Sequence, residues 1–198
     1  MQNKQLRILS LGLLMSLACS VATIPANTPV PMPTVVTSIE IPSAKIDYYE
    51  VSGATEGEIR EQLNALASVD ENGYRGDALT SWEIHWMWDG YGTESCDLSS
   101  VTATYDVRVR FPRWNPPQDA SRELIVKWNI YVRALAEHEK VHVDNVVASL
   151  PYVIKAIRGA ACDTAEARAQ EVLALIRQYD IDYDERTGHG ETQGAIFP

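Results

Sequence analysis

The chain has 198 residues, of which 45% are hydrophobic, and it carries a formal net charge of −10 at pH 7. This length accommodates one domain with a hydrophobic core, and the composition is that of a globular protein. The negative charge, together with the lack of a basic stripe, argues against nucleic acid or an anionic membrane surface as a partner.

The first 22 residues have the pattern of a signal peptide. Lys4 and Arg7 precede an apolar run from Leu9 to Leu17, and a small-x-small cleavage site ends at Ala22. The run is too short to span a bilayer as a helix. We therefore expect export to the periplasm or to the medium. A lipoprotein is the alternative, because Cys19 ends an imperfect lipobox, and membrane attachment would then run through its lipid.

Prolines recur among threonine and valine in residues 25–42. Such a composition favours an extended, disordered spacer between the export signal and the domain. The expected organisation is a signal peptide at 1–22, a Pro/Thr-rich linker at 23–44 and one domain at 45–198. In the exported domain Cys96 and Cys162 remain, and an oxidising compartment predicts a disulfide between them.

Alternating hydrophobicity predicts strands in the domain. We expect them at Lys45–Val51, Leu79–Trp88 and Val101–Phe111. The second strand places an aromatic face, made by Trp82, Trp86 and Trp88 together with Ile84, opposite His85.

Helical periodicity and capping signals predict the helices. One follows the capping box Thr55-x-x-Glu58, and a long one begins at Asn115-Pro116. The long helix is interrupted near Pro151 and resumes as far as Gly159. A last helix is capped by Asp163-x-x-Glu166 and loses its pattern after Tyr179. The polar, glycine-rich composition of Asp182–Pro198 is typical of a frayed tail.

A His-Glu-x-x-His motif occupies residues 138–142, inside a stretch without glycine or proline. On a helix His138 and His142 lie on one face, where they continue an apolar stripe and so point inward. Glu139 lies about 100° further round the helix, within reach of a water shared with them. Two imidazoles, one carboxylate base and an open position are what metal-assisted hydrolysis requires, and Zn²⁺ is the expected ion.

A catalytic zinc ion usually has a third protein ligand. The candidates in this sequence are His189, His85, Glu166 and Glu171. We favour His189, because Gly188 and Gly190 on either side allow the backbone to approach a metal closely. Glu139 is the expected general base, and Tyr183 is the nearest plausible donor to the oxyanion that forms during hydrolysis.

Five stretches carry a resemblance to a known family. They are Tyr-Glu-Val-Ser-Gly at 49–53, Thr-Ser-Trp-Glu-Ile-His-Trp at 80–86, Cys96, His-Glu-Lys-Val-His at 138–142 and Tyr-Asp-Glu-Arg-Thr-Gly-His-Gly at 183–190. From Tyr48 onward the chain resembles a bacterial domain-of-unknown-function family described as predicted secreted zinc-dependent proteases, within the zincin metallopeptidases. The resemblance implies a zinc hydrolase and also points to His189 as a ligand.

The resemblance further implies an α+β, zincin-like fold. In it a small, mostly antiparallel sheet packs on a long helix that carries the His-Glu-x-x-His motif, with further helices around it. We therefore predict an exported zinc metallopeptidase that acts on a protein or peptide substrate. Two alternatives remain: a non-catalytic zinc-binding envelope protein, and a module that binds a ligand on the aromatic strand face of Trp82, Trp86 and Trp88.

Overall fold

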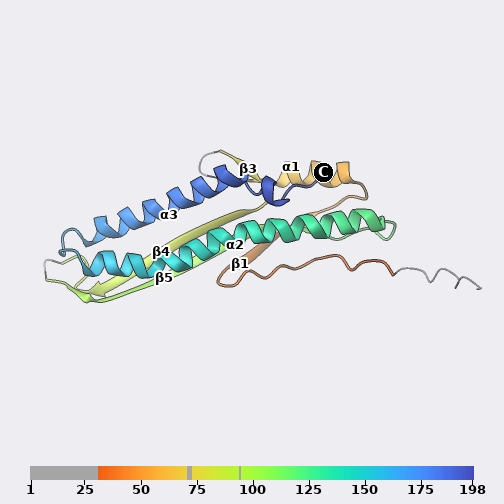
Figure 1. Ribbon diagram of the computed structural model, residues 1–198. Helices are drawn as coiled ribbons and strands as arrows, with labels where there is room; N and C mark the ends of the chain where they lie inside the picture. Colours follow the sequence, from red (N-terminus) through yellow and green to blue (C-terminus); the bar gives the residue numbers. More distant parts are fainter. Residues whose placement is uncertain (1–30, 71–72, 94) are drawn as a thin grey trace, which may run out of the picture. The chain divides into compact units, whose positions relative to one another are not determined.

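The computed structural model describes residues 31–70, 73–93 and 95–198, and residues 32–198 form one unit. The expected signal peptide, Cys19 and the start of the expected linker lie outside the described residues. The unit is a mixed α+β structure with a small sheet and three helices (Figure 1).

Three strands form the main sheet: β1 (Lys45–Val51), β4 (Leu79–Asp89) and β5 (Asp97–Trp114). Their order is β1-β5-β4, with β5 parallel to β1 and antiparallel to β4. The expected mostly antiparallel sheet is therefore mixed. The three predicted strands are all present, and alternate residues of β5 such as Val107 and Val109 are buried, as their pattern predicts. A separate two-stranded hairpin joins β2 (Ser68–Val69) to β3 (Arg75–Gly76).

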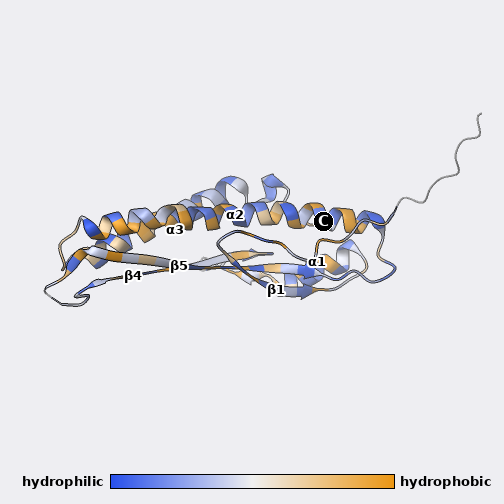
Figure 2. Ribbon diagram, turned by 90° about the horizontal axis from the view of Figure 1, so that it is seen from below, coloured by the Kyte–Doolittle hydropathy of each residue, from blue (hydrophilic) through white to orange (hydrophobic). Residues whose placement is uncertain are grey.

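Three helices accompany the sheet: α1 (Glu56–Leu66), α2 (Arg122–Arg158) and α3 (Ala165–Thr187). A short 3-10 helix, η1 (Glu191–Gln193), follows α3. Helices α2 and α3 run antiparallel to each other, and Figure 2 shows them in one layer with the strands in another. Across the described ranges, no helix combines the length and the apolar character needed to cross a membrane.

Helix α1 begins where its capping box predicts. The Thr55 side chain accepts a hydrogen bond from the Glu58 backbone N–H at 3.3 Å, and the Glu58 carboxylate accepts one from the Ala54 N–H at 2.7 Å. Gly53 has a φ of 141°, and a Cβ there would lie 2.8 Å from the Cβ of Glu58. The turn into α1 thus requires glycine at this position.

Two predicted interruptions at proline do not occur. Strand β5 continues through Pro112 to Trp114, because Pro112 lies beyond the end of β4 and pairs only with β1. Helix α2 likewise passes through Pro151, which is solvent-exposed, and extends without interruption to Arg158. Packing against α3 compensates for the one backbone hydrogen bond that proline removes.

Helix α2 ends at its C-cap residue Gly159, as predicted, but it begins later than predicted, and α3 ends later than predicted. Helix α2 starts after Ser121, whose side chain accepts a hydrogen bond from the Leu124 N–H at 3.1 Å, and not at Asn115-Pro116. Helix α3 starts after Thr164 without a side-chain cap, and it continues to Thr187. The first part of the expected frayed tail, Asp182–Thr187, is therefore helical, and Asp184 within it faces α2.

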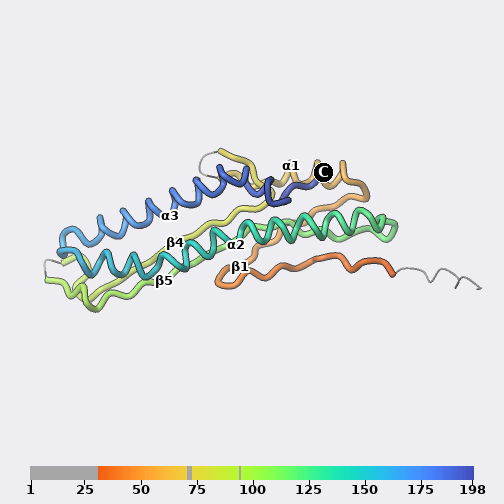
Figure 3. The backbone as a smooth tube through the Cα atoms, in the orientation of Figure 1, coloured from red at the N-terminus to blue at the C-terminus, as the bar shows by residue number. Residues whose placement is uncertain are grey.

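Residues 32–44 are packed on the domain and do not form a free spacer (Figure 3). Ile41 is only 4% exposed, and the backbone of Ile39 exchanges two hydrogen bonds with the Tyr48 hydroxyl. The Asn129 side chain on α2 accepts from the Val36 N–H at 2.7 Å and donates to the Thr34 carbonyl at 2.9 Å. Side chains hold this extended segment, so its prolines are compatible with an ordered conformation.

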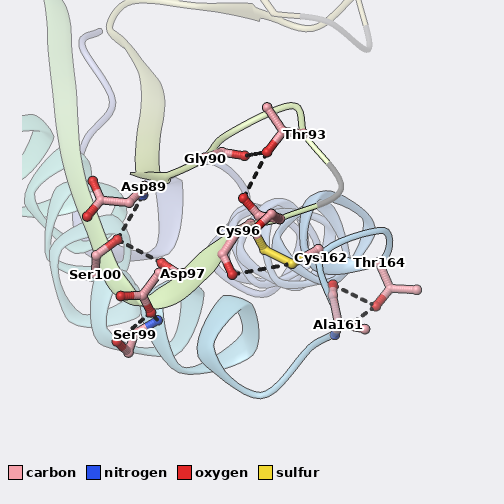
Figure 4. Close-up of a disulfide and its surroundings, with 11 residues drawn as sticks. Asp89, Gly90, Thr93, Cys96, Asp97, Ser99, Ser100, Ala161, Cys162 and Thr164 are labelled. Atoms are coloured by element: carbon pink, nitrogen blue, oxygen red, sulfur yellow. Dashed lines mark hydrogen bonds between the residues drawn. A yellow bond between two sulfur atoms is a disulfide. The ribbon is translucent and has the colours of Figure 1, made fainter.

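The predicted disulfide between Cys96 and Cys162 is present (Figure 4). Cys96 directly precedes β5, and Cys162 lies in the turn between α2 and α3, with a Cα–Cα distance of 5.9 Å. The bond therefore ties the turn of the helical pair to the end of the β4–β5 ribbon. Disulfides persist in oxidising compartments, so this feature is compatible with an exported protein.

Replacing both cysteines by alanine is expected to lower the free energy of unfolding by about 4 kcal/mol, the loop-closure value for a separation of 66 residues. Denaturant unfolding of the oxidised wild type and the double variant measures the difference. Reduced wild-type protein is the control and is expected to match the variant. Equal stability of the oxidised and reduced wild type would contradict the prediction.

Candidate metal centre

The His-Glu-x-x-His motif lies in the middle of α2, on the side that faces α3. His138, Glu139 and His142 are 3%, 4% and 7% exposed, respectively. Three neighbouring ionisable side chains are thus buried: the two histidines against α3, and Glu139 against β4. Burial of such groups is costly unless each has a polar or ionic partner.

Asp184 on α3 is the partner of both histidines. Its Oδ1 lies 3.1 Å from Nε2 of His138 and 3.1 Å from Nε2 of His142, and the two Nε2 atoms are 3.4 Å apart. Among the described residues, these three form a group whose potential ligand atoms all lie within 4.8 Å of one another. The protein therefore contains a possible metal-binding triad: His138, His142 and Asp184.

The other ring nitrogen of each histidine also has a partner. Nδ1 of His142 lies 3.2 Å from Oδ1 of Asp180, and Asn145 and Trp82 both donate to this carboxylate. Nδ1 of His138 lies 3.0 Å from Oε1 of Gln193. Oxygen acceptors at Nδ1 favour a proton there, which leaves the Nε2 lone pairs to converge beside Asp184.

The electrostatics of the triad favour a positive charge between its members. Burial lowers the pKa of His142, but hydrogen bonds to Asp180 and Asp184 outweigh burial and raise this pKa to about 10. Burial raises the pKa of Asp184, but its hydrogen bonds to both histidines hold the pKa well below its usual range. A metal cation supplies the same positive charge and takes the Nε2 and carboxylate oxygens as ligands.

Glu139 lies beside the triad and has its own anchor. Its Oε2 accepts a hydrogen bond from the Thr80 hydroxyl on β4 at 2.6 Å. Burial raises the pKa of Glu139, against the opposing effects of the nearby histidines and of Thr80. A carboxylate with a raised pKa is suited to accept a proton and to donate it again at neutral pH.

The triad and Glu139 open onto a cleft of about 1240 Å³. One wall is Ala78 with the β4 residues Leu79–Glu83, and others come from α3, the β2–β3 hairpin and the C-terminal residues. Strand β4 is an edge strand, because its only partner in the sheet is β5. The possible metal site therefore lies next to a strand edge that has no partner strand among the described residues.

A model of the bacterial protein family of unknown function DUF922 matches residues 46–190. The chain belongs to this family. No curated protein and no solved structure matches it. The family description states no activity, so the expected zinc protease activity stays a prediction for this DUF922 protein.

In this DUF922 protein His189, the favoured third ligand, lies beside the triad and is not one of its members. Its Nδ1 is 3.8 Å from Oδ2 of Asp184, and its ring stacks on Tyr74 with 3.5 Å between the centroids. The residue lines the cleft. The third member of the possible metal-binding triad is Asp184, which was not among the expected ligands, and the role of His189 as a ligand stays a prediction.

The other candidate ligands are engaged elsewhere. The His85 side chain is 62% exposed and pairs with Glu83. Glu166 accepts hydrogen bonds from Trp86 Nε1 and the Tyr91 hydroxyl, and Glu171 pairs with Arg168 on the surface of α3.

Tyr183, the expected oxyanion donor, does not line the cleft. Its ring stacks on His138 with 5.0 Å between the centroids, and its hydroxyl is hydrogen-bonded to Gln193. The described contacts therefore give Tyr183 a supporting place behind His138.

The aromatic strand face, the candidate ligand surface, is covered by α3. Trp82 and Trp86 donate hydrogen bonds to Asp180 and Glu166 of that helix, and Trp88 is 6% exposed. Trp82 and Trp86 therefore help to pack α3 on the sheet, and Trp82 also lines the cleft.

Sequence reasoning missed Asp180, Asp184, Gln193 and Thr80. One signal was available for the two aspartates: their spacing of four residues in α3 matches that of His138 and His142 in α2. Two antiparallel helices with such pairs can bring all four side chains together. No comparable pattern in the sequence marks Gln193 or Thr80.

Proposed function

We propose that the protein is a zinc-dependent peptidase whose metal is held by His138, His142 and Asp184. The convergence of three donor atoms, with separations of 3.1, 3.1 and 3.4 Å, is the observation that carries the proposal. Donors at zinc–ligand distances of 2.0–2.1 Å in a tetrahedral site lie about 3.3 Å apart. The triad thus has the dimensions of one face of a zinc tetrahedron.

The donor types favour zinc over the common hard cations. Calcium and magnesium prefer sets of oxygen ligands. Two imidazole nitrogens and one carboxylate are a ligand set of catalytic zinc sites. Catalytic zinc sites keep three protein ligands and leave one position for water or substrate. A site with three protein ligands beside an open cleft fits a catalytic role better than a structural one.

The residues of the site have separate tasks in the proposed hydrolysis. Zinc, when bound, acts as a Lewis acid that acidifies water and polarises a carbonyl group. Glu139 accepts the proton of the attacking water and later delivers it to the leaving amine. Thr80 holds Oε2 of Glu139 in place, and the buried setting keeps the transferred proton on the carboxyl group.

The cleft wall supports a polypeptide substrate. Residues Leu79–Glu83 of edge strand β4 line the cleft beside the triad. An extended peptide can pair with such an edge through main-chain hydrogen bonds, which hold it regardless of its side chains. This pairing would deliver a peptide carbonyl to the triad.

An exported location completes the proposal. The Cys96–Cys162 bond suits an oxidising compartment, and a chain that begins with a signal peptide or a lipobox at Cys19 would reach one.

Zinc content and hydrolysis of a mixed peptide library test the proposal together. Purified protein is expected to carry about one zinc per chain. A chelator is expected to abolish hydrolysis, and added zinc to restore it. Turnover that survives complete zinc removal would overturn the mechanism. Stoichiometric zinc without hydrolysis of any peptide would instead support a non-catalytic zinc-binding protein.

A further inference from the structure

The C-terminal segment Gly188–Phe197 turns back from α3 onto the motif helix. Gly188, His189 and Gly190 have successive positive φ angles of 58°, 53° and 84°. A Cβ on Gly190 would lie 3.0 Å from Cγ of His138. The glycine therefore allows the main chain to lie directly against the His138 ring.

The same segment is anchored beyond the turn. The Ala195 N–H donates to the Gly190 carbonyl at 3.0 Å, which closes the loop around η1. Phe197 is 2% exposed, and its ring lies 5.8 Å from that of Trp128 and 5.3 Å from that of Tyr131. Gln193 thus lies between a tight turn and a buried aromatic anchor, so its side chain is presented from a fixed backbone.

The Gln193 amide bridges two aromatic rings. Its Oε1 lies 3.0 Å from Nδ1 of His138, and its Nε2 donates to the Tyr183 hydroxyl at 2.9 Å. The Tyr183 hydroxyl also donates to Oε1 at 3.2 Å, so the amide oxygen lies between the Tyr183 hydroxyl and Nδ1 of His138, where it can accept from both. Tyr183 in turn stacks on the His138 ring at an interplanar angle of 18°. The ring is held both at its edge and on its face.

We propose that Gln193 is a positioning residue, which keeps a proton on Nδ1 of His138 and thereby presents Nε2 to the metal. The inference rests on the proposed function, because it concerns the same zinc site. It assigns different partners to the two histidines: His142 is oriented by a carboxylate of α3, and His138 by an amide from the C-terminal segment. Zinc affinity then depends on the packing of the C-terminal segment Gly188–Phe197 against α2.

Competition between the full chain and a chromophoric chelator, with zinc as the only added metal, tests this role. Gln193→Met removes the acceptor at similar side-chain length and is expected to weaken zinc binding by about tenfold to a hundredfold. Gln193→Glu keeps an acceptor oxygen and is expected to restore most of the affinity. Gln170→Met is the matched control, because Gln170 is exposed and hydrogen-bonded only to Glu166.

Nitrogen NMR of the histidine side chains reports which ring nitrogen carries the proton. A loss of packing alone would not change this tautomer. In the zinc-loaded wild type His138 is expected to coordinate through Nε2 and to carry its proton on Nδ1, whereas Gln193→Met is expected to show a second His138 species. Thermal unfolding in chelator measures the stability of each variant without metal.

The outcomes separate the two proposals. A wild type that binds no zinc would overturn the proposed function and this inference with it. Tight zinc binding by both the wild type and Gln193→Met would overturn the positioning role alone. If Gln193→Met and Gln193→Glu lost zinc affinity equally, and both were less stable in chelator, Gln193 would contribute packing alone. That result would also overturn the positioning role.

Discussion

Glu139→Gln is expected to lower kcat for peptide hydrolysis by about a hundredfold or more, while zinc content stays at the wild-type level. The amide is nearly isosteric with the carboxylate and retains an oxygen that can accept from Thr80, so the local packing is preserved. It has no basic oxygen for the proton of the attacking water. Because Glu139 is not a member of the triad, the metal is expected to remain.

Parallel measurements of kcat and zinc content on the variant and the wild type check this prediction. Glu137→Gln is the matched control, because Glu137 is the exposed carboxylate two residues before Glu139 on the same helix. It is expected to leave both quantities unchanged. Full hydrolytic activity in Glu139→Gln would exclude Glu139 as the general base, and loss of zinc would give it a place among the ligands.

The half of the site on α2 was predictable because its geometry is local. The spacing of His138 and His142 fixes their relation on any helix, and the surrounding apolar stripe fixes the side that faces inward. The structure places both histidines inside, as this reasoning predicts, and Glu139 is buried as well.

The half on α3 was not predictable in the same way. The approach of Asp184 to the histidines depends on the register of two antiparallel helices, which arises from packing over their whole length. Local composition even argued against a helix there, since Asp180, Asp182 and Asp184 replace the apolar stripe of the preceding turns. Two of these acids face the histidines, so a polar cluster takes the place of the apolar contacts.

The errors in the fold have a related cause. Local rules predict a break in regular structure at the prolines of β5 and α2. They also predict disorder in the proline-rich segment at 32–44. These predictions fail for different reasons: Pro112 lies beyond the end of β4, Pro151 lies on the exposed side of α2, and side chains such as Asn129 hold the segment at 32–44. Local rules for proline do not include these neighbours.

Asp184→Ala is expected to reduce zinc affinity by more than about a hundredfold and to abolish hydrolysis. Loss of a residue that only hydrogen-bonds to a ligand costs at most about that much affinity. The substitution removes the one oxygen that lies 3.1 Å from both Nε2 atoms. Two neutral imidazoles from one helix then remain, without a negative charge to balance the cation. Circular dichroism of the metal-free variant checks that α2 and α3 still form.

His189→Ala decides between the two candidates for the third ligand. With Asp184 as ligand, the variant is expected to retain zinc, because His189 reaches the site only through Oδ2 of Asp184 at 3.8 Å. Asp182→Ala is the control for the loss of an acid from α3, since Asp182 is exposed and bonded to Gln178. If His189→Ala lost the metal and Asp184→Ala kept it, the ligand assignment would return to His189, and Asp184 would become its hydrogen-bond partner.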